Sequence, residues 1–528
     1  MPSNSDRKQK ITLYPWQSEC LSLWKENNRH GIVHVITGAG KTFFAIAAAQ
    51  ELIDSCGGNA VVCVVVPTVA LAAQWKKQIS SISESGERVG LYCGSVKSGS
   101  DCRWMIYVVN SARYSISRHI LKSMEAGKHV LLICDECHHY TSAENRKIFD
   151  FIGSRGFNMS LYSSLGLSAT PRCAGLDDVL VPALGKIIFT YSFSRGTEEN
   201  TVSRFALFQI SLRFTPDEQL QYNSFNYDIQ AALRKTLKEH PELAKLDRVS
   251  FFHALQKVAK ADGEDSPAHA LLTLYYRRRL LSILARRRMD CTVGIIRELP
   301  EDTRMFIFCE RIDQAEAMWR VLESEFPGQA LCYHSKFSKE ARNGVLFRFR
   351  NHQGRILVCC KALDEGLDVP DASVAVILSG TGQERQRIQR LGRILRRNSG
   401  KRFACLYYCH VTDSAEDWQY LPKLDRDFPQ LDLYFHAVAG SASGSFEHPE
   451  YLDLSNELLA KYKSAGCGAD VLSELRTCLL RGQLLPDWLE PPEVLHAKAE
   501  SAESPREKNY FYAMKRLSCL RLTSAGYK

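Results

Sequence analysis

The chain contains the segment Gly31-Ile32-Val33-His34-Val35-Ile36-Thr37-Gly38-Ala39-Gly40-Lys41-Thr42, an apolar run that ends in a glycine-rich loop. The helical stretch Phe43 to Leu52 follows directly. Glycines let backbone N–H groups turn toward an anion, and the start of a helix adds a positive electrostatic end. The segment therefore predicts a strand, a loop and a helix that together hold a triphosphate at residues 37–42.

The residues of this loop have distinct expected roles. Lys41 would reach the β and γ phosphates, and Thr42 would offer its hydroxyl to Mg²⁺, as the last two residues of a G-x-x-x-x-G-K-[ST] loop do. The residues expected to line the phosphates beside them are Thr37, Gly38, Ala39 and Gly40. Val35 stands where the full pattern has glycine. An ordinary strand–turn–helix with a solvated lysine is therefore the alternative.

A second apolar run, Val130 to Cys134, is followed by the tetrad Asp135-Glu136-Cys137-His138. The run is typical of a strand buried on both faces. The carboxyl ends of strands in an open α/β sheet face the ligand crevice, so we expect Asp135 to bind Mg²⁺ and Glu136 to polarise the attacking water. A metal site is the alternative, with sulfur and imidazole ligands from Cys134, Cys137, His138 and His139. It is disfavoured because no second ligand pair completes a set of four.

Five further segments accompany these two. They are Leu13-Tyr14-Pro15-Trp16-Gln17; Val64-Val65-Val66-Pro67-Thr68, with Gln74-Trp75 downstream; Gly166-Leu167-Ser168-Ala169-Thr170-Pro171; Asp364-Glu365-Gly366-Leu367-Asp368-Val369-Pro370; and Gln389-Arg390-Leu391-Gly392-Arg393-Ile394-Leu395-Arg396. In order and spacing, across most of residues 10 to 412, the chain resembles the superfamily 2 helicases of the Asp-Glu-Cys-His type. It looks most like their XPB and type III restriction helicase branch.

The resemblance implies two RecA-like domains in tandem and gives the first-domain motifs their roles. Gln17 would bond the base edge of ATP. The contacts to nucleic acid would come from Pro67, Thr68 and Gln74. The residues that couple hydrolysis to movement would be Ser168, Ala169 and Thr170.

In the second domain the resemblance places Gly366 and Asp368 at the nucleotide. Lys361 lies where such helicases often carry a threonine that touches the nucleic-acid backbone, so Lys361 is a candidate phosphate contact. His334, in Tyr333-His334-Ser335, is a candidate nucleic-acid contact, with a satisfied surface histidine as the alternative.

The last motif can also be interpreted from physical principles. Residues three apart on a helix share one face, so Gln389, Gly392, Arg393 and Arg396 form one stripe. Guanidinium groups stabilise charge on a transferring phosphoryl group and can be delivered from another domain. Arg393 and Arg396 are therefore the candidate arginine fingers, with Gln389 beside them. A solvated basic face is the alternative.

Composition sets wider bounds. The 528 residues are 45% hydrophobic and 24% charged, and the net charge of +9 permits a polyanionic partner without requiring one. No run approaches 18 apolar residues and the N-terminus lacks a signal-peptide pattern, so we expect a cytoplasmic protein without a membrane partner. The 18 cysteines are scattered, many inside apolar strands, and predict reduced buried thiols.

The expected fold class is α/β, with two parallel-sheet domains, a helical insertion between them and a mainly helical C-terminal region. The predicted boundaries are 1–10 for an N-terminal tail, 11–200 for the first RecA-like domain, 201–295 for the insertion, 296–412 for the second domain and 413–528 for the C-terminal region. Gly440 to Ser445 predicts a flexible linker.

The insertion carries two basic segments, Tyr275-Tyr276-Arg277-Arg278-Arg279 and Ala285-Arg286-Arg287-Arg288. They offer charges for phosphates and rings for base stacking. A solvated helical face explains them equally well.

The predicted function is an ATP- and Mg²⁺-dependent nucleic-acid helicase or translocase. The branch resemblance implies DNA, with 3′-to-5′ movement. A role as the motor of a repair or phage-defence complex, with a nuclease encoded separately, is a further hypothesis. The alternative is a non-unwinding ATPase switch or sensor stimulated by DNA or RNA, which a strand-displacement assay would distinguish.

Overall fold

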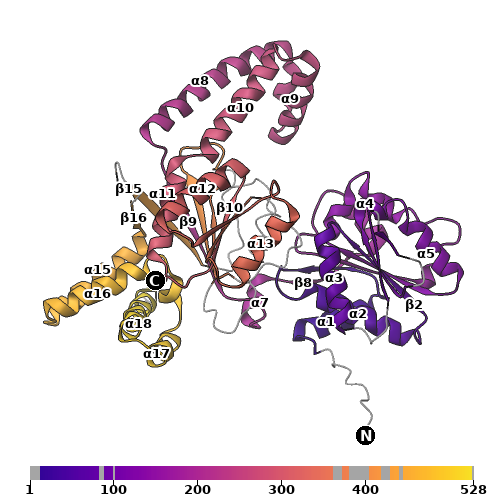
Figure 1. The fold of residues 1–528 in the computed structure, drawn as a ribbon, viewed down its shortest axis with the longest axis horizontal. Helices are drawn as coiled ribbons and strands as arrows, with labels where there is room; N and C mark the ends of the chain where they lie inside the picture. The colour runs from indigo at the N-terminus through magenta and orange to yellow at the C-terminus, as the bar shows by residue number, and fades with distance from the viewer. Residues whose placement is uncertain are drawn as a thin grey trace, which may run out of the picture. The chain divides into compact units, whose positions relative to one another are not determined.

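The computed structural model describes residues 12–82, 88–94, 96–98, 102–360, 372–379, 404–417, 429–438 and 444–525. They fall into two compact units, one that runs to Arg204 and one that starts at Phe205 (Figure 1). In these ranges no helix has both the length and the apolar character that a bilayer crossing requires.

An eight-stranded sheet forms the centre of the first unit, in the order β4-β3-β5-β2-β6-β7-β1-β8. The strands are β1 Ile32–Val35, β2 Ala60–Val66, β3 Val89–Cys93, β4 Val96–Lys97, β5 Trp104–Val108, β6 His129–Asp135, β7 Tyr162–Ser168 and β8 Ile187–Tyr191. All neighbours are parallel except β3 and β4. The predicted parallel-sheet fold is confirmed here.

Helices connect these strands. They are α1 Pro15–Glu26, α2 Lys41–Ser55, α3 Val69–Ile82, α4 Val109–Ala112, α5 Ile116–Glu125, α6 Val181–Leu184 and α7 Phe193–Glu198. Every residue of β2 is buried, as is every residue of β6 after His129. This is why both strands are continuous apolar runs, since a parallel sheet is covered on both faces.

The second unit has its own eight-stranded sheet, in the order β11-β12-β10-β13-β14-β9-β15-β16. The strands are β9 Phe205–Leu212, β10 Met305–Cys309, β11 Ala330–Tyr333, β12 Ile356–Cys360, β13 Val374–Ile377, β14 Ala404–Val411, β15 Gln430–Ala437 and β16 Gly444–Glu447. Only β15 and β16 pair antiparallel. Helices α12 Ile312–Glu325 and α13 Lys339–Arg350 follow β10 and β11.

The strand β9 departs from the predicted boundaries, which placed residues 201–295 in a helical insertion. It pairs in parallel with β14 on one side and β15 on the other, so it belongs to the second sheet. Both partners lie far downstream in the chain. The apolar run of β9 therefore had no neighbour in the sequence from which a sheet could be inferred.

The helical insertion itself is confirmed as three helices that form an arm: α8 Pro216–Glu239, α9 Arg248–Asp262 and α10 Pro267–Ile283. Figure 1 shows these helices side by side, projecting from the second unit. Their distal part has a small core of its own, made of Ile229, Leu255, Ala259, Ala268 and Leu271. Helix α11 Arg286–Glu298 then leads back to the sheet.

Among its described residues the C-terminal region is mainly helical, as predicted. Its helices are α15 Pro449–Ser464, α16 Ala469–Gly482, α17 Pro492–Glu500 and α18 Pro505–Ala525. The hairpin of β15 and β16 precedes them, and β16 begins at Gly444, inside the segment predicted as a linker. Trp488 and Phe511 share one hydrophobic core with Ile307 and Val376 of the sheet. The C-terminal helices are therefore part of the second unit.

Candidate nucleotide site

The glycine-rich loop lies at the carboxyl end of β1, directly before α2. Gly38 and Gly40 have φ values of 87° and 93°, in the left-handed region that glycine adopts at little cost. A Cβ atom at Gly40 would lie 3.1 Å from the Gln17 Nε2 atom. Gly40 is therefore favoured by conformation and by space, and it leaves the N-terminal end of α2 facing the loop.

Gln17 is hydrogen-bonded to this loop. It is fully buried; its Nε2 donates to the Gly40 carbonyl at 3.2 Å and its Oε1 accepts from the Tyr14 backbone N–H at 2.9 Å. The structure thus places the predicted adenine-reading residue in contact with the phosphate loop. Its bond to a base remains a prediction.

Three charged residues meet at this edge of the sheet. The Lys41 ammonium lies 3.0 Å from the Glu136 Oε1 atom. Glu136 directly follows β6 and has a φ of 49°, a left-handed conformation that costs a non-glycine residue energy and is often found at functional sites. Asp135, the last residue of β6, accepts from the Trp75 indole at 2.8 Å and from the Glu136 N–H at 3.0 Å. The structure brings these three predicted residues together.

The environment shifts the pKa values of the Asp135 and Glu136 carboxyl groups in opposite directions. Burial, and then the neighbouring Glu136 charge, raises the pKa of Asp135 to about 6. Burial alone would also raise the pKa of Glu136, but Lys41 and His138 outweigh it, so that pKa is lowered. Glu136 therefore stays an ionised hydrogen-bond acceptor, whereas Asp135 is a buried carboxyl group whose charged form gains from a nearby cation.

These residues fit a nucleotide with its divalent cation. The Glu136 Oε2 atom is buried and, among the described residues, accepts no hydrogen bond, although the His138 Nδ1 atom lies 3.5 Å away. Buried polar atoms are rarely left unsatisfied, so such an atom beside an anion-binding loop indicates a site for a ligand or a water molecule. Lys41 supplies a cation for the phosphates, and Asp135 and Thr42 supply the oxygen ligands that Mg²⁺ prefers.

The coupling motif is connected to this site by hydrogen bonds. Ser168 Oγ lies 2.8 Å from His138 Nδ1 and accepts from the Thr170 N–H at 2.9 Å. His34 Nε2, on β1, lies 3.0 Å from the Ala169 carbonyl oxygen. The predicted triplet Ser168-Ala169-Thr170 therefore contacts both the Asp-Glu-Cys-His segment and the strand that leads into the loop.

Sequence reasoning missed two residues of the site. His34 is the one polar side chain in its four-residue strand, a signal that could have been noticed. Trp75 gave no such signal, because its contact with Asp135 spans 60 positions in the chain. The metal-site alternative also meets an obstacle, since Cys134 is fully buried within β6 and His138 bonds Ser168.

The proposed nucleic-acid contacts of the first unit follow β2. Pro67, Thr68 and Gln74 are half-buried, and Thr68 Oγ1 accepts from the Leu71 N–H at 3.3 Å at the start of α3. Because β2 pairs with β6, these residues lie at the same edge of the sheet as Asp135.

Several predicted residues of the second domain lie outside the described ranges: Lys361, Gly366, Asp368, Gln389, Arg393 and Arg396. Their roles stay predictions. His334 is described, but it is only 1% exposed and its ring stacks on Phe337 with centroids 3.9 Å apart. The structure therefore offers no exposed imidazole at this position for nucleic acid, contrary to the expectation for His334.

The basic segments of the insertion also differ from expectation. Arg288 is fully buried and pairs with Asp417. Arg278 bonds Glu416 and Arg279 bonds Glu310. Only Arg277 and Arg286 of these arginines are exposed. Charge satisfied within the protein, rather than phosphate binding, explains three of these six arginines.

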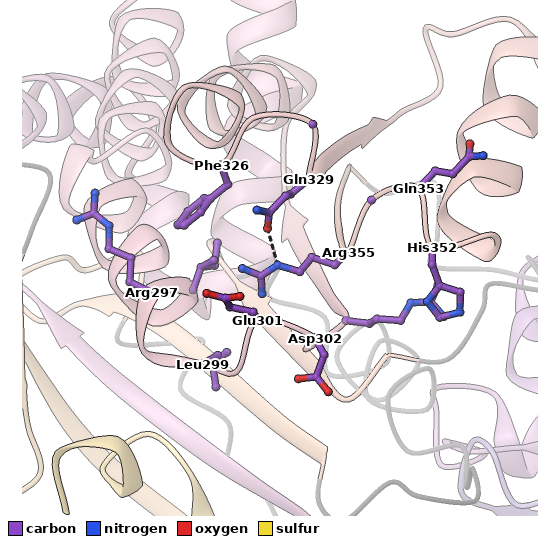
Figure 2. Close-up of a pocket in the computed structure, with 13 residues that line it drawn as sticks. Arg297, Leu299, Glu301, Asp302, Phe326, Gln329, His352, Gln353 and Arg355 are labelled. Carbon is purple, nitrogen blue, oxygen red and sulfur yellow. Dashed lines mark hydrogen bonds between the residues drawn. The ribbon is translucent and has the colours of Figure 1, made fainter. Parts of the chain in front are cut away.

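A large cavity of about 800 Å³ lies in the second unit. Figure 2 shows its lining, which includes Arg297, Glu301 and Arg355, with the bond from Arg355 to Gln329 at 2.6 Å. The lining residues come from the end of α11 and from the turns that precede β10, β11 and β12. Because ligands of open α/β sheets bind at the carboxyl ends of strands, this cavity is not the expected nucleotide site.

The parallel sheets, the glycine-rich loop and the carboxylates after β6 define a P-loop ATPase. Two families match the chain: "Type III restriction enzyme, res subunit" over residues 10–173 and "Helicase conserved C-terminal domain" over residues 287–398. The "DNA 3'-5' translocase XPB2" of Sulfurisphaera tokodaii is 28% identical over 399 residues, which cover 74% of this chain and 80% of the relative. The "Putative DNA 3'-5' helicase Rad25" of Halobacterium salinarum is 24% identical, and the match covers 74% of this chain but only 53% of that relative.

Among solved structures, the helicase domain of Pyrococcus furiosus Hef matches 79% of this chain and 99% of its own, with a TM-score of 0.50 at 16% identity. At that identity the likeness concerns the fold alone. The chain carries the two tandem domains of a superfamily 2 helicase and is similar to the XPB and type III restriction branch. It is an ATP-hydrolysing helicase.

Proposed function

We propose that this helicase moves 3′ to 5′ on DNA and hydrolyses ATP with Mg²⁺ at the site formed by Lys41, Thr42, Asp135 and Glu136. The main support for this hydrolysis site is the ion pair of Lys41 and Glu136, 3.0 Å apart, beside the glycine-rich loop. The choice of DNA and the direction rest on the names of the XPB2 and Rad25 relatives.

In this proposal Lys41 exchanges its Glu136 partner for the phosphates. Glu136, released from that pair, accepts a hydrogen bond from the attacking water and orients it. Thr42 and Asp135 would hold Mg²⁺, which neutralises charge on the phosphates when it is bound. Arg393 and Arg396, with Gln389, would complete the site from the second domain.

The nucleic-acid contacts in this proposal come from Pro67, Thr68, Gln74 and Lys361. Arg277, which is exposed on the arm, adds a candidate phosphate contact. Work in the cytoplasm as the motor subunit of a repair or phage-defence complex, with a nuclease as partner, is a further part of the proposal. It rests on the branch resemblance alone.

The test is ATP hydrolysis by the wild type and by Lys41→Ala, without nucleic acid and with single-stranded DNA, duplex DNA, single-stranded RNA or duplex RNA. We expect DNA to stimulate the wild type most strongly and Lys41→Ala to be inactive in every condition. Stronger stimulation by RNA would overturn the choice of DNA. No stimulation by any of the four polymers would overturn the nucleic-acid motor.

The direction needs a second assay. Duplexes with a 3′ or a 5′ single-stranded overhang distinguish the two polarities, and displacement of a third strand from a triplex reports translocation without unwinding. We expect activity on the 3′ overhang. Stimulated hydrolysis with no strand displaced in any substrate would favour the non-unwinding switch.

A further inference from the structure

The base of the helical arm is attached to the carboxyl ends of three adjacent strands in the second sheet. These strands, β10, β13 and β14, are neighbours in the sheet order. The attachment is polar and largely buried. It joins the last two turns of α10 to residues just beyond each strand.

Glu416, beyond β14, is the centre of this attachment. Its Oε1 accepts from Arg278 Nε of α10 at 2.7 Å, and its Oε2 accepts from the Tyr222 hydroxyl of α8 at 2.6 Å. The Arg278 guanidinium also donates to Asn226 at 2.7 Å and lies over the Tyr222 ring. The side chains of Arg278 and Glu416 are only 12% and 11% exposed. One carboxylate therefore connects both long helices of the arm to the sheet.

The end of β10 makes a second charged link. Glu310 directly follows β10, is 9% exposed, and accepts from Arg279 at 2.5 Å. The Glu310 backbone N–H donates to Ser379, beyond β13, at 3.2 Å and to Gln314 at 3.1 Å. Two consecutive arginines of α10 thus pair with acids from two different strand ends.

The last carbonyl groups of α10 are also bound. A helix leaves its final carbonyls without partners inside the helix. Here Arg288 Nε donates to the Ser282 carbonyl at 2.8 Å, and Gln314 Nε2 donates to the Ile283 carbonyl at 2.6 Å. Arg288 simultaneously donates to the Leu378 carbonyl at 2.5 Å and the Cys409 carbonyl at 2.7 Å. The same guanidinium therefore holds the arm, β13 and β14.

We propose that Arg278 and Glu416 are positioning residues that transmit engagement of nucleic acid by the arm to the strand ends of the second motor domain. The proposal rests on the proposed function, in which nucleic acid stimulates hydrolysis. The arm has a hydrophobic core of its own at its distal end, and its base is hydrogen-bonded to the strand ends. A displacement of the arm would therefore act on the sheet. The motif segments 361–371 and 380–403 follow β12 and β13 directly in the chain, and strand ends of this kind carry the ligand-binding loops of α/β sheets.

The test compares Glu416→Gln with Arg277→Gln in the full chain. We measure the rate of ATP hydrolysis without DNA, the maximal rate with DNA and the DNA concentration that gives half of the stimulation. Glu416→Gln is expected to lower maximal stimulation by about 5-fold or more, because coupling energies between sites are typically of that size or larger. Its rate without DNA and its half-saturating DNA concentration should stay unchanged. Arg277→Gln should instead raise the half-saturating DNA concentration.

Two variants serve as controls. Arg278→Lys keeps a cation at the base of the arm and should restore part of the stimulation that Arg278→Gln loses. Asp313→Asn breaks an exposed pair with Arg311 in the same unit and should change nothing. If Glu416→Gln fails to fold, Arg279→Gln tests the attachment through its second link, to Glu310, since the Arg279 side chain is 38% exposed and its loss is easier to tolerate.

Two results would overturn the inference alone: full stimulation of Glu416→Gln, or a parallel loss of its rate without DNA, which would mark a merely structural role. A wild type that DNA does not stimulate would overturn the proposed function as well. The wild-type measurement in the same assay therefore separates the two failures.

Discussion

Both sheets carry acidic residues at the carboxyl ends of central strands, but the two sets have different counter-charges. In the first unit, Glu136 meets Lys41, which lies on a glycine-rich loop. In the second unit, Glu310 and Glu416 meet arginines of the packed helix α10. The same position in an α/β sheet can therefore serve a ligand or serve the protein itself.

The ion pairs differ in whether every oxygen of the carboxylate has a hydrogen-bond partner. Glu136 keeps one buried oxygen that accepts no hydrogen bond from the described residues, and so does Glu310. Glu416, in contrast, accepts hydrogen bonds from the arm at both of its oxygens. A pair that can be exchanged for a ligand is suited to catalysis. A saturated pair is suited to transmitting movement.

The largest expected effect is on the first pair. Glu136→Gln removes the water-orienting carboxylate, and we expect ATP hydrolysis to fall by about 100-fold or more, since such groups typically contribute that much. Binding of a fluorescent ATP analogue should be retained, because Lys41 loses its competing carboxylate partner. Steady-state hydrolysis and fluorescence titration measure the two quantities.

The control for this change is Glu144→Gln, which removes an exposed carboxylate paired with Lys147. It should leave hydrolysis unaltered. Hydrolysis by Glu136→Gln at the wild-type rate would show that the two kinds of ion pair do not differ as described.

The next effect concerns a buried ion pair of the second unit. Arg288→Met leaves Asp417 buried without its partner, and breaking a buried ion pair in this way costs about 3–5 kcal/mol of unfolding free energy. Urea denaturation, followed through the unfolding transition of the second unit, measures this loss of unfolding free energy. Combining Arg288→Met with Asp417→Leu should recover much of it, because no charge is then buried alone.

Arg286→Met is the matched control, since Arg286 is exposed on the same helix. It should change stability by less than about 0.5 kcal/mol. An equal loss in Arg286→Met and Arg288→Met would contradict the burial argument.

A smaller effect is expected from His34, which connects the loop strand to the coupling motif. His34→Leu removes the 3.0 Å bond to the Ala169 carbonyl, worth about 1 kcal/mol, so we expect DNA-stimulated hydrolysis to fall several-fold. The rate without DNA should change less. His34→Gln keeps an N–H donor and should recover part of the loss; a rate for His34→Leu equal to wild type would remove His34 from the site.

The smallest effect is at the tip of the arm. Asp262 bonds His240 at 2.8 Å and raises its pKa above the ordinary value of 6.5. A raised pKa in the folded state stabilises the tip at low pH, and the stabilisation is lost as pH rises through that pKa. Amide hydrogen exchange at the end of α8 should therefore increase with pH more in the wild type than in His240→Gln. His253→Gln, on the exposed face of α9, should behave as the wild type.

The loop could be predicted because its chemistry is local in the chain. Gly38, Gly40 and Lys41 need only their neighbours to be interpreted, and the apolar strands before the loop and before Asp135 fix the edge of the sheet on which they lie. The arginines of the insertion could not be assigned in this way. Arg278 and Glu416 are 138 positions apart and Arg288 and Asp417 are 129 apart, so no local pattern reveals that these charges are paired.

The boundary of the second domain failed for the same reason. A strand is recognised by its apolar pattern, but the sheet that it joins is decided by its partners. The partners of β9 follow it only after the arm and most of the second sheet. The helices of the arm could be predicted from their own periodicity. Their ion pairs with residues at the strand ends could not be predicted.

The central position of β9 has a consequence for biosynthesis. Phe205 pairs with Ala404, so at ordinary translation speeds of roughly 5–20 residues per second the strand would leave the ribosome about 10–40 s before its partner. During that interval Phe-Ala-Leu-Phe-Gln-Ile-Ser-Leu is an apolar, uncharged strand segment without a mate, which is the pattern that aggregates most readily. The second sheet can therefore not be completed until β14 has been synthesised, and β9 lacks this partner during that interval.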